Sequence, residues 1–247
     1  DVKKFKESIK SLKLKERILS STIEEHKKSI AETQASKIIL FETLITVFVT
    51  RVEEKIKLTE GDIESEAIAN TGKLGLQIID LKDRDITIIL FKKIFFNIED
   101  AHMDIAYNSL KLTEPSLDQN SRNALKDINT LSQRRIAYYT NFIFQYIDNT
   151  SPGTASNPLA HFLSSYILMV SYAMNDEYGN SKLESFESVF TKLTDQYPYK
   201  SIRGIKKQLG DDFISDLKEI DLPDNSKFNS RKKSIASIWE FDIGEID

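Results

Sequence analysis

At 247 residues, the chain is long enough to bury a sizeable core as one large domain or two small ones. Its 40% apolar and 29% charged residues are typical of a globular protein, and the absence of cysteine excludes disulfides, thiol catalysis and cysteine-ligated metal. The net charge of −4 argues against nucleic-acid binding. Residues 211–247 hold ten acidic and five basic residues, so the acidic excess lies at this end.

The chain is poor in residues that break helices. It has only 8 Gly and 5 Pro, the first of them at Gly61 and Pro115, so the turn residues that an all-β fold requires are missing. We therefore predict an all-α fold, a multi-helix bundle with a long N-terminal helix.

The N-terminal segment carries apolar residues in a heptad pattern from Val2 to Val47. A seam of this length predicts a long helix that packs along another helix, within the chain or in a partner, and that ends near residues 58–61. From Ile38 the apolar residues become denser, which predicts burial on several sides. His26 lies at a seam position, where we expect a tolerated polar contact. The seam residues that we expect to bind a partner are Phe5, Ile9, Leu12, Leu19, Ile23 and Ile30.

The middle of the chain predicts three further segments. Residues 61–80 contain Gly72 and Gly75, which indicate a break or kink. Residues 86–110 are strongly apolar; their first six could form a strand, but we expect a helix because no other segment alternates as a pairing strand would. Residues 112–150 predict another long helix, with Thr113 as its cap and Pro115 in its first turn.

Residues 149–158 form the clearest loop in the sequence, and they suggest a division of the chain. We expect a long-helix portion over 1–150, compact C-terminal helices over 151–222 that pack on it within one continuous domain, and a linker with an acidic tail over 223–247. Within the second part, helices are expected from Pro158 and across 182–196, 200–209 and 211–220. In the tail, Trp239 and Phe241 are either a docking motif for a partner or, as we expect, apolar groups that pack back onto the bundle.

The helix expected from Pro158 carries no charge up to Asn175. Its apolar part would form about 25 Å of helix, which is shorter than a helix of the roughly 20 residues needed to span a bilayer. His161 and Ser164 lie on a narrow polar stripe along it, whereas the remaining faces are apolar. This pattern predicts a packed central helix, with the stripe as the place where a small ligand would sit.

Motifs for catalysis or cofactor binding are scarce. Glu99 and His102 lie three residues apart on one predicted helix face, a spacing that di-iron bundles use in pairs, but no second such motif is present, and we expect no bound metal. Gly72-Lys73 lacks the surrounding pattern of a phosphate-binding loop. We therefore expect no cofactor, no catalytic residues and no small-molecule ligand.

These observations favour a non-enzymatic protein that binds another protein, or itself as a homodimer, through a helical face. The alternatives are a membrane-active helical protein and a helical enzyme with a dispersed site. No signal peptide or transmembrane helix is apparent, so we expect a cytoplasmic protein or the mature form of an exported one.

Overall fold

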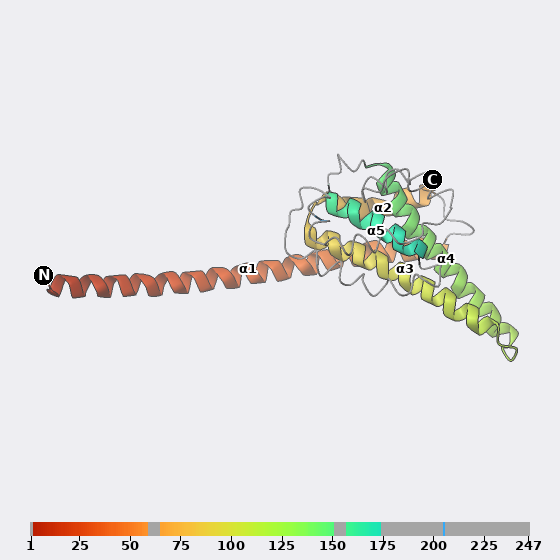
Figure 1. Cartoon of the computed structure of the whole chain (residues 1–247), viewed down its shortest axis with the longest axis horizontal. Helices are drawn as coiled ribbons and strands as arrows, with labels where there is room; N and C mark the ends of the chain where they lie inside the picture. Colours follow the sequence, from red (N-terminus) through yellow and green to blue (C-terminus); the bar gives the residue numbers. More distant parts are fainter. Residues whose placement is uncertain (1, 59–64, 151–156, 174–204, 206–247) are drawn as a thin grey trace. The chain divides into compact units, whose positions relative to one another are not determined.

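The computed structural model describes residues 2–58, 65–150, 157–173 and 205, without the side chains of residues 2–19, 65–71, 169, 172 and 173. In this part of the chain it contains five α-helices and no strand, which confirms the all-α prediction (Figure 1). The helices are α1 (Val2–Leu58), α2 (Ser65–Asp80), α3 (Arg84–Leu112), α4 (Gln119–Asp148) and α5 (Pro158–Ala173).

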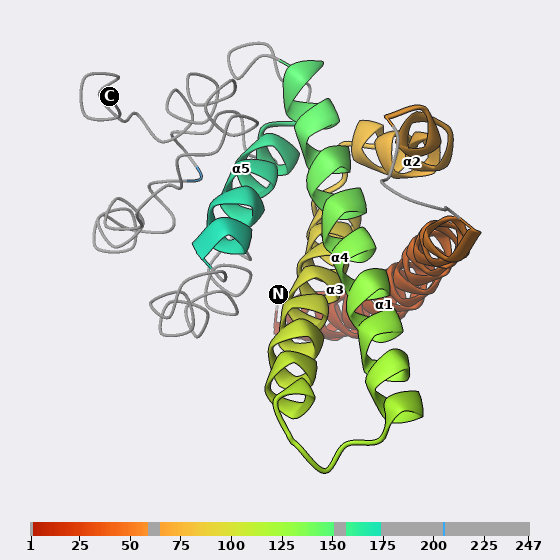
Figure 2. The ribbon, with the colours of Figure 1, turned by 90° about the vertical axis from the view of Figure 1, so that its right-hand side faces the viewer.

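Residues 1–43 form one compact unit and residues 44–247 a second, so α1 begins in the first and ends in the second. The second unit is built on a hairpin of α3 and α4, which lie side by side and are joined at one end by a short loop (Figure 2). Helices α2 and α5 each pack on both arms of this hairpin. The buried core therefore lies where these four helices meet, at the end of the hairpin away from its loop.

Helix α1 is one uninterrupted helix that ends at Leu58, within the range expected from the sequence. Its final part buries Ile45, Phe48, Val52 and Ile56, a stripe in steps of three and four residues that meets one side of the hairpin through Phe48 and Phe142. This stripe is displaced by one residue from the heptad seam, and the structure does not show the seam as a packed contact.

The expected burial of α1 on several sides from Ile38 onward is wrong. Ile38, Ile39 and Leu40 are 43%, 64% and 56% exposed, whereas the neighbouring Phe41 is buried at 7%. A dense run of apolar residues winds around all faces of a helix, and burial of one face leaves the others in solvent. The density of apolar residues thus predicted the position of the helix but not its buried face.

Gly72 and Gly75 do not break or kink a helix, contrary to expectation, but lie within the continuous helix α2. A Cβ atom on Gly75 would lie 2.8 Å from Cζ of Phe142 and 2.9 Å from Cε2 of Phe48, two rings that also contact each other. Glycine is thus present because the two phenylalanine rings approach the helix backbone closely.

Replacing Gly75 by alanine should lower the free energy of unfolding by about 1–3 kcal/mol, because both rings are buried and the extra methyl group overpacks the core. In an open helix the same change raises stability by about 0.5–1 kcal/mol. Urea denaturation measures whether the substitution raises or lowers the free energy of unfolding. Gly72→Ala is the milder comparison, since its Cβ would meet only the Phe142 ring, at 3.1 and 3.3 Å, and it should cost less stability than Gly75→Ala. A stabilised Gly75→Ala variant would contradict this packing.

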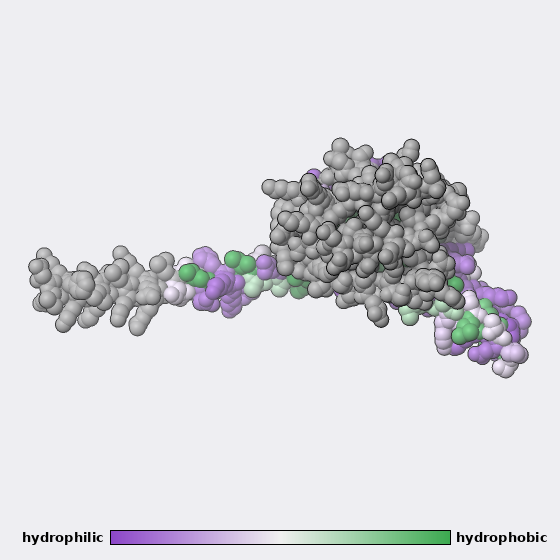
Figure 3. All heavy atoms as spheres, viewed as in Figure 1, coloured by the Kyte–Doolittle hydropathy of each residue, from purple (hydrophilic) through white to green (hydrophobic). Residues whose placement is uncertain are grey.

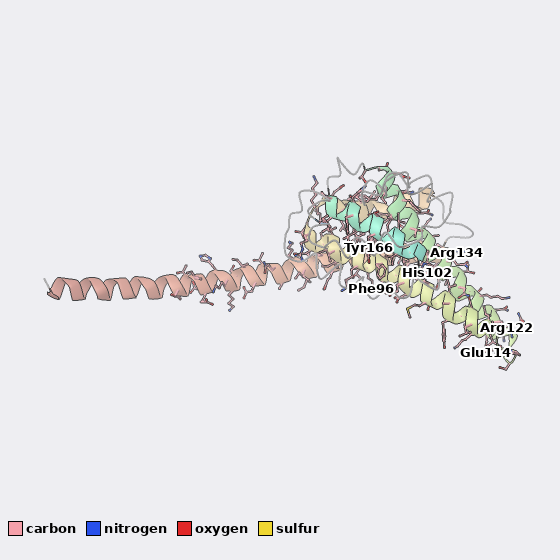
Figure 4. All side chains as sticks on the ribbon, in the orientation of Figure 1. Phe96, His102, Glu114, Arg122, Arg134 and Tyr166 are labelled. Carbon is pink, nitrogen blue, oxygen red and sulfur yellow. The ribbon has the colours of Figure 1, made fainter. Side chains whose placement is uncertain are left out.

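The loop of the hairpin also differs from expectation. Thr113 is the C-cap of α3 and not the N-cap of α4, which begins only after Asp118, whose carboxylate accepts the Ser121 backbone N–H at 2.9 Å. An N-cap side chain accepts a free backbone N–H two or three residues ahead, which Asp118 can reach and the more distant Thr113 cannot. The Arg122 side chain closes the loop by donating to the carbonyls of Leu112, Glu114 and Leu117, and Figure 4 places Arg122 and Glu114 together at this end.

Helix α5 begins at Pro158, as expected. Pro158 itself is half-buried, and every other described side chain of the helix is buried. Asn157, which immediately precedes this helix, is 3% exposed. Its side-chain amide donates to the carbonyl of Ile79 at 3.0 Å and to Oγ1 of Thr87 at 3.1 Å. The Asn157 side-chain oxygen accepts the backbone N–H of Ala160. One side chain therefore joins the end of α2 and the start of α3 to the start of α5.

Among the residues that the structure describes, no helix combines the length and apolar character needed to cross a membrane. The helices expected across 182–196, 200–209 and 211–220 and the tail with Trp239 and Phe241 lie outside the described residues, apart from the buried Ile205.

Candidate functional site

A polar hollow of about 390 Å³ lies where α3 and α4 meet the last turns of α1. We call this the polar hollow and define it by the residues that line it, which are Glu53, Asn97, Asp100, Met103, Asp104 and Arg135. Three carboxylates and one guanidinium give it two excess negative charges.

The cation of the hollow is already paired. Arg135 on α4 donates from Nε and Nη2 to the two carboxylate oxygens of Glu53 on α1, at 2.8 and 2.9 Å, and both side chains are 23% exposed. This bidentate geometry holds α1 against the hairpin, and the hydrogen bonds to Glu53 raise the pKa of Arg135.

The excess charge of the hollow comes from Asp100 and Asp104, one helical turn apart on α3. Both are exposed, and within the described part of the chain neither forms a salt bridge. Asp104 accepts a hydrogen bond from the Ser132 hydroxyl at 3.3 Å. Burial and then the adjacent Asp100 raise the pKa of Glu99, on the neighbouring face of α3. Among the residues that line the hollow, the carboxylates therefore outnumber the single guanidinium of Arg135, which also interacts electrostatically with Asp104.

Glu99 and His102 do lie on one helix, as predicted, but the structure gathers no third ligand around them. Among the described residues no group of three or more His, Cys, Asp or Glu is placed to hold a metal ion. Burial lowers the pKa of His102, whose Nε2 atom is buried without a hydrogen-bond partner among the described residues, and Figure 4 shows this residue on α3.

The predicted partner-binding residues of α1 fall into two groups. Phe5, Ile9, Leu12 and Leu19 lie on the helix, but their side chains are outside the description. Ile23 and Ile30 are 53% and 57% exposed, and Leu40, at a later position of the same seam, is 56% exposed.

The polar stripe of α5 is buried in the core. His161 and Ser164 are fully buried; Nδ1 of His161 lies 3.1 Å from Oγ1 of Thr150, and its ring lies 6.1 Å from that of Tyr146. Nε2 of His161, Oγ of Ser164 and the hydroxyl of Tyr146 are buried without a hydrogen-bond partner among the described residues. These residues therefore form a buried polar cluster within the described core.

The polar hollow was not predicted from the sequence. Its ion pair joins residues 82 positions apart, a separation at which pairing leaves no local pattern. Only the spacing of Asp100 and Asp104, four residues apart on a predicted helix, was visible. Comparisons of the chain with models of protein families, with curated proteins and with solved structures found no match.

Proposed function

We propose that this chain is a non-enzymatic helical interaction protein that binds another protein through the seam of α1. The observation that carries the proposal is the exposure of three aliphatic side chains at seam positions of one helix: Ile23, Ile30 and Leu40 are all more than half exposed. Aliphatic residues at heptad positions on a long helix form a face that a second helix covers by knobs-into-holes packing.

Three hydroxyl residues along this face are compatible with burial. The hydroxyl groups of Thr33, Ser36 and Thr43 donate to carbonyls one turn earlier in α1, at 2.9, 3.0 and 2.8 Å. A partner helix that covers them therefore leaves no hydroxyl proton unpaired, and the usual cost of burying a polar group is small. Their small size also permits close approach of a second backbone.

The test compares two double substitutions in the same helix. Ile30→Ser with Leu40→Ser removes seam residues, whereas Ile38→Ser with Ile39→Ser removes exposed residues beside the seam. Each lost contact with a buried aliphatic side chain costs about 1.5–3 kcal/mol, so the first variant should bind its partner at least about tenfold more weakly and the control should bind normally.

The partner is obtained by affinity capture on the full chain from its native source, followed by titration with each purified variant. Equal binding by the two variants would contradict a role for the seam. Circular dichroism should show the same helix content for both, because all four side chains are exposed.

A further inference from the structure

The loop end of the hairpin carries an apolar stripe along α3. Met103, Tyr107 and Leu110 are 64%, 58% and 70% exposed, and their spacing of four and three residues places them on one face. Ile128 of α4, 42% exposed, lies beside them, because the Asn108–Asn129 hydrogen bond fixes the two helices at this level. Apolar side chains are visible among polar ones at this end in Figure 3. We call Met103, Tyr107 and Leu110 the hairpin stripe.

One edge of the hairpin stripe is charged, with opposite signs at its two ends. Asp100 and Asp104 of the polar hollow lie at one end, and Lys111 lies at the other, with its ammonium 4.5 Å from the Tyr107 ring centroid. At 100° per residue these three charged residues fall within about 40° of one another around the helix. The stripe thus has an acidic and a basic end along the same edge.

Such a stripe is complementary to itself when two copies lie antiparallel. If Met103 faces Leu110 of a second copy, a two-fold axis passes beside Tyr107, and the apolar residues cover one another. In this register the second copy's Lys111 lies about 3 Å along the helix axis from Asp100 and equally far from Asp104, since each residue advances 1.5 Å. The two-fold axis keeps the charged edges on the same side, so both contacts form twice.

We propose that two copies of this chain associate through the hairpin stripe, α3 against α3 in antiparallel orientation, with Lys111 of each copy entering the polar hollow of the other. The second copy supplies a second cation to a hollow whose lining carries three carboxylates and one guanidinium, and the hollow has room for a lysine side chain. This surface is separate from the seam of α1, so the two proposals fail or succeed independently.

The test is a charge exchange followed by sedimentation equilibrium of the full chain. Lys111→Glu and the pair Asp100→Lys with Asp104→Lys each place like charges in the interface, so each variant alone should associate at least about tenfold more weakly than the wild type. Mixed together they should form a one-to-one heterodimer, because both contacts of that dimer again join opposite charges. Raising the salt concentration should weaken the wild-type dimer through screening.

The matched control for the aspartate pair is Glu25→Lys with Asp127→Lys, which changes the net charge by the same amount at exposed residues that belong to neither the hairpin stripe nor the polar hollow and should leave association intact. Met103→Ser with Leu110→Ser should abolish it, and thermal melts confirm folding of each variant. A wild-type chain that stays monomeric across micromolar concentrations, or a mixture that fails to form the heterodimer, would overturn the proposal. Association that falls with the seam variant Ile30→Ser, Leu40→Ser and persists with Lys111→Glu would also overturn it.

Discussion

Replacing Asn157 by alanine is expected to lower the free energy of unfolding by about 2–4 kcal/mol, the sum of a lost helix cap and of buried groups left unpaired. The substitution removes the acceptor for the backbone N–H of Ala160 and the donor to the Ile79 carbonyl and the Thr87 hydroxyl. Because Asn157 is 3% exposed, water does not readily replace these partners. Urea denaturation of the purified variant measures the loss.

Asn157→Asp separates the two contributions. Aspartate keeps an oxygen for the cap of α5, but it places a second oxygen at the position from which the amide now donates to Ile79 and Thr87. Repulsion and the burial of charge should make this variant at least as unstable as Asn157→Ala at neutral pH. An aspartate variant of wild-type stability would show that the amide does not join α5 to α2 and α3.

Acidification from pH 7 towards pH 4 is expected to remove about 2–3 kcal/mol of stability through His161 alone. Burial lowers the pKa of His161 from 6.5 to about 4 in the folded protein, and each unit of difference corresponds to 1.36 kcal/mol. Between these values the unfolded chain binds a proton that the folded chain does not, so the free energy of unfolding falls as the pH falls.

The hydrogen bonds around His161 indicate which ring nitrogen carries the proton in the folded protein. The Thr150 hydroxyl donates its proton to the Tyr146 carbonyl at 2.6 Å, so its oxygen accepts from Nδ1 of His161, and Nε2 is the deprotonated nitrogen. A second proton on Nε2 would have no acceptor among the described residues.

Thermal melts between pH 7 and pH 4.5 test this assignment. His161→Gln should show a shallower decline of melting temperature than the wild type, because glutamine does not titrate and carboxylates contribute equally to both proteins. Parallel declines would mean that His161 is accessible to protons in the folded state.

The fold was largely predictable because most helix boundaries are local. Scarce glycine and proline indicated long helices, and Pro158 marked a helix start because its fixed backbone angle suits the first turn. The strand alternative for the start of α3 fails for the reason expected, since the described chain offers no strand to pair with it. Thr113 was wrongly predicted as the cap of this helix, because the residue that caps it is Asp118, whose carboxylate accepts the backbone N–H three residues ahead.

Features that depend on distant contacts were beyond sequence reasoning. Gly75 was predicted to mark a helix break. The actual reason for a glycine there is the approach of Phe48 and Phe142 from two other helices, which the sequence does not show. The buried face of α1 is displaced by one residue from the predicted seam, since the partner of that face is set by the tertiary fold and not by the repeat. The polar hollow joins Glu53 to Arg135 across 82 positions.

The central proposal is that the seam of α1 binds a protein, and photo-crosslinking from within the seam tests it most directly. When a photoreactive residue replaces Ile30 in the full chain and the protein is irradiated in its native source, it should become covalently joined to one defined protein. The same residue at Ile39, which is 64% exposed beside the seam, should not. Equal labelling from both positions, or labelling from neither, would contradict the proposal.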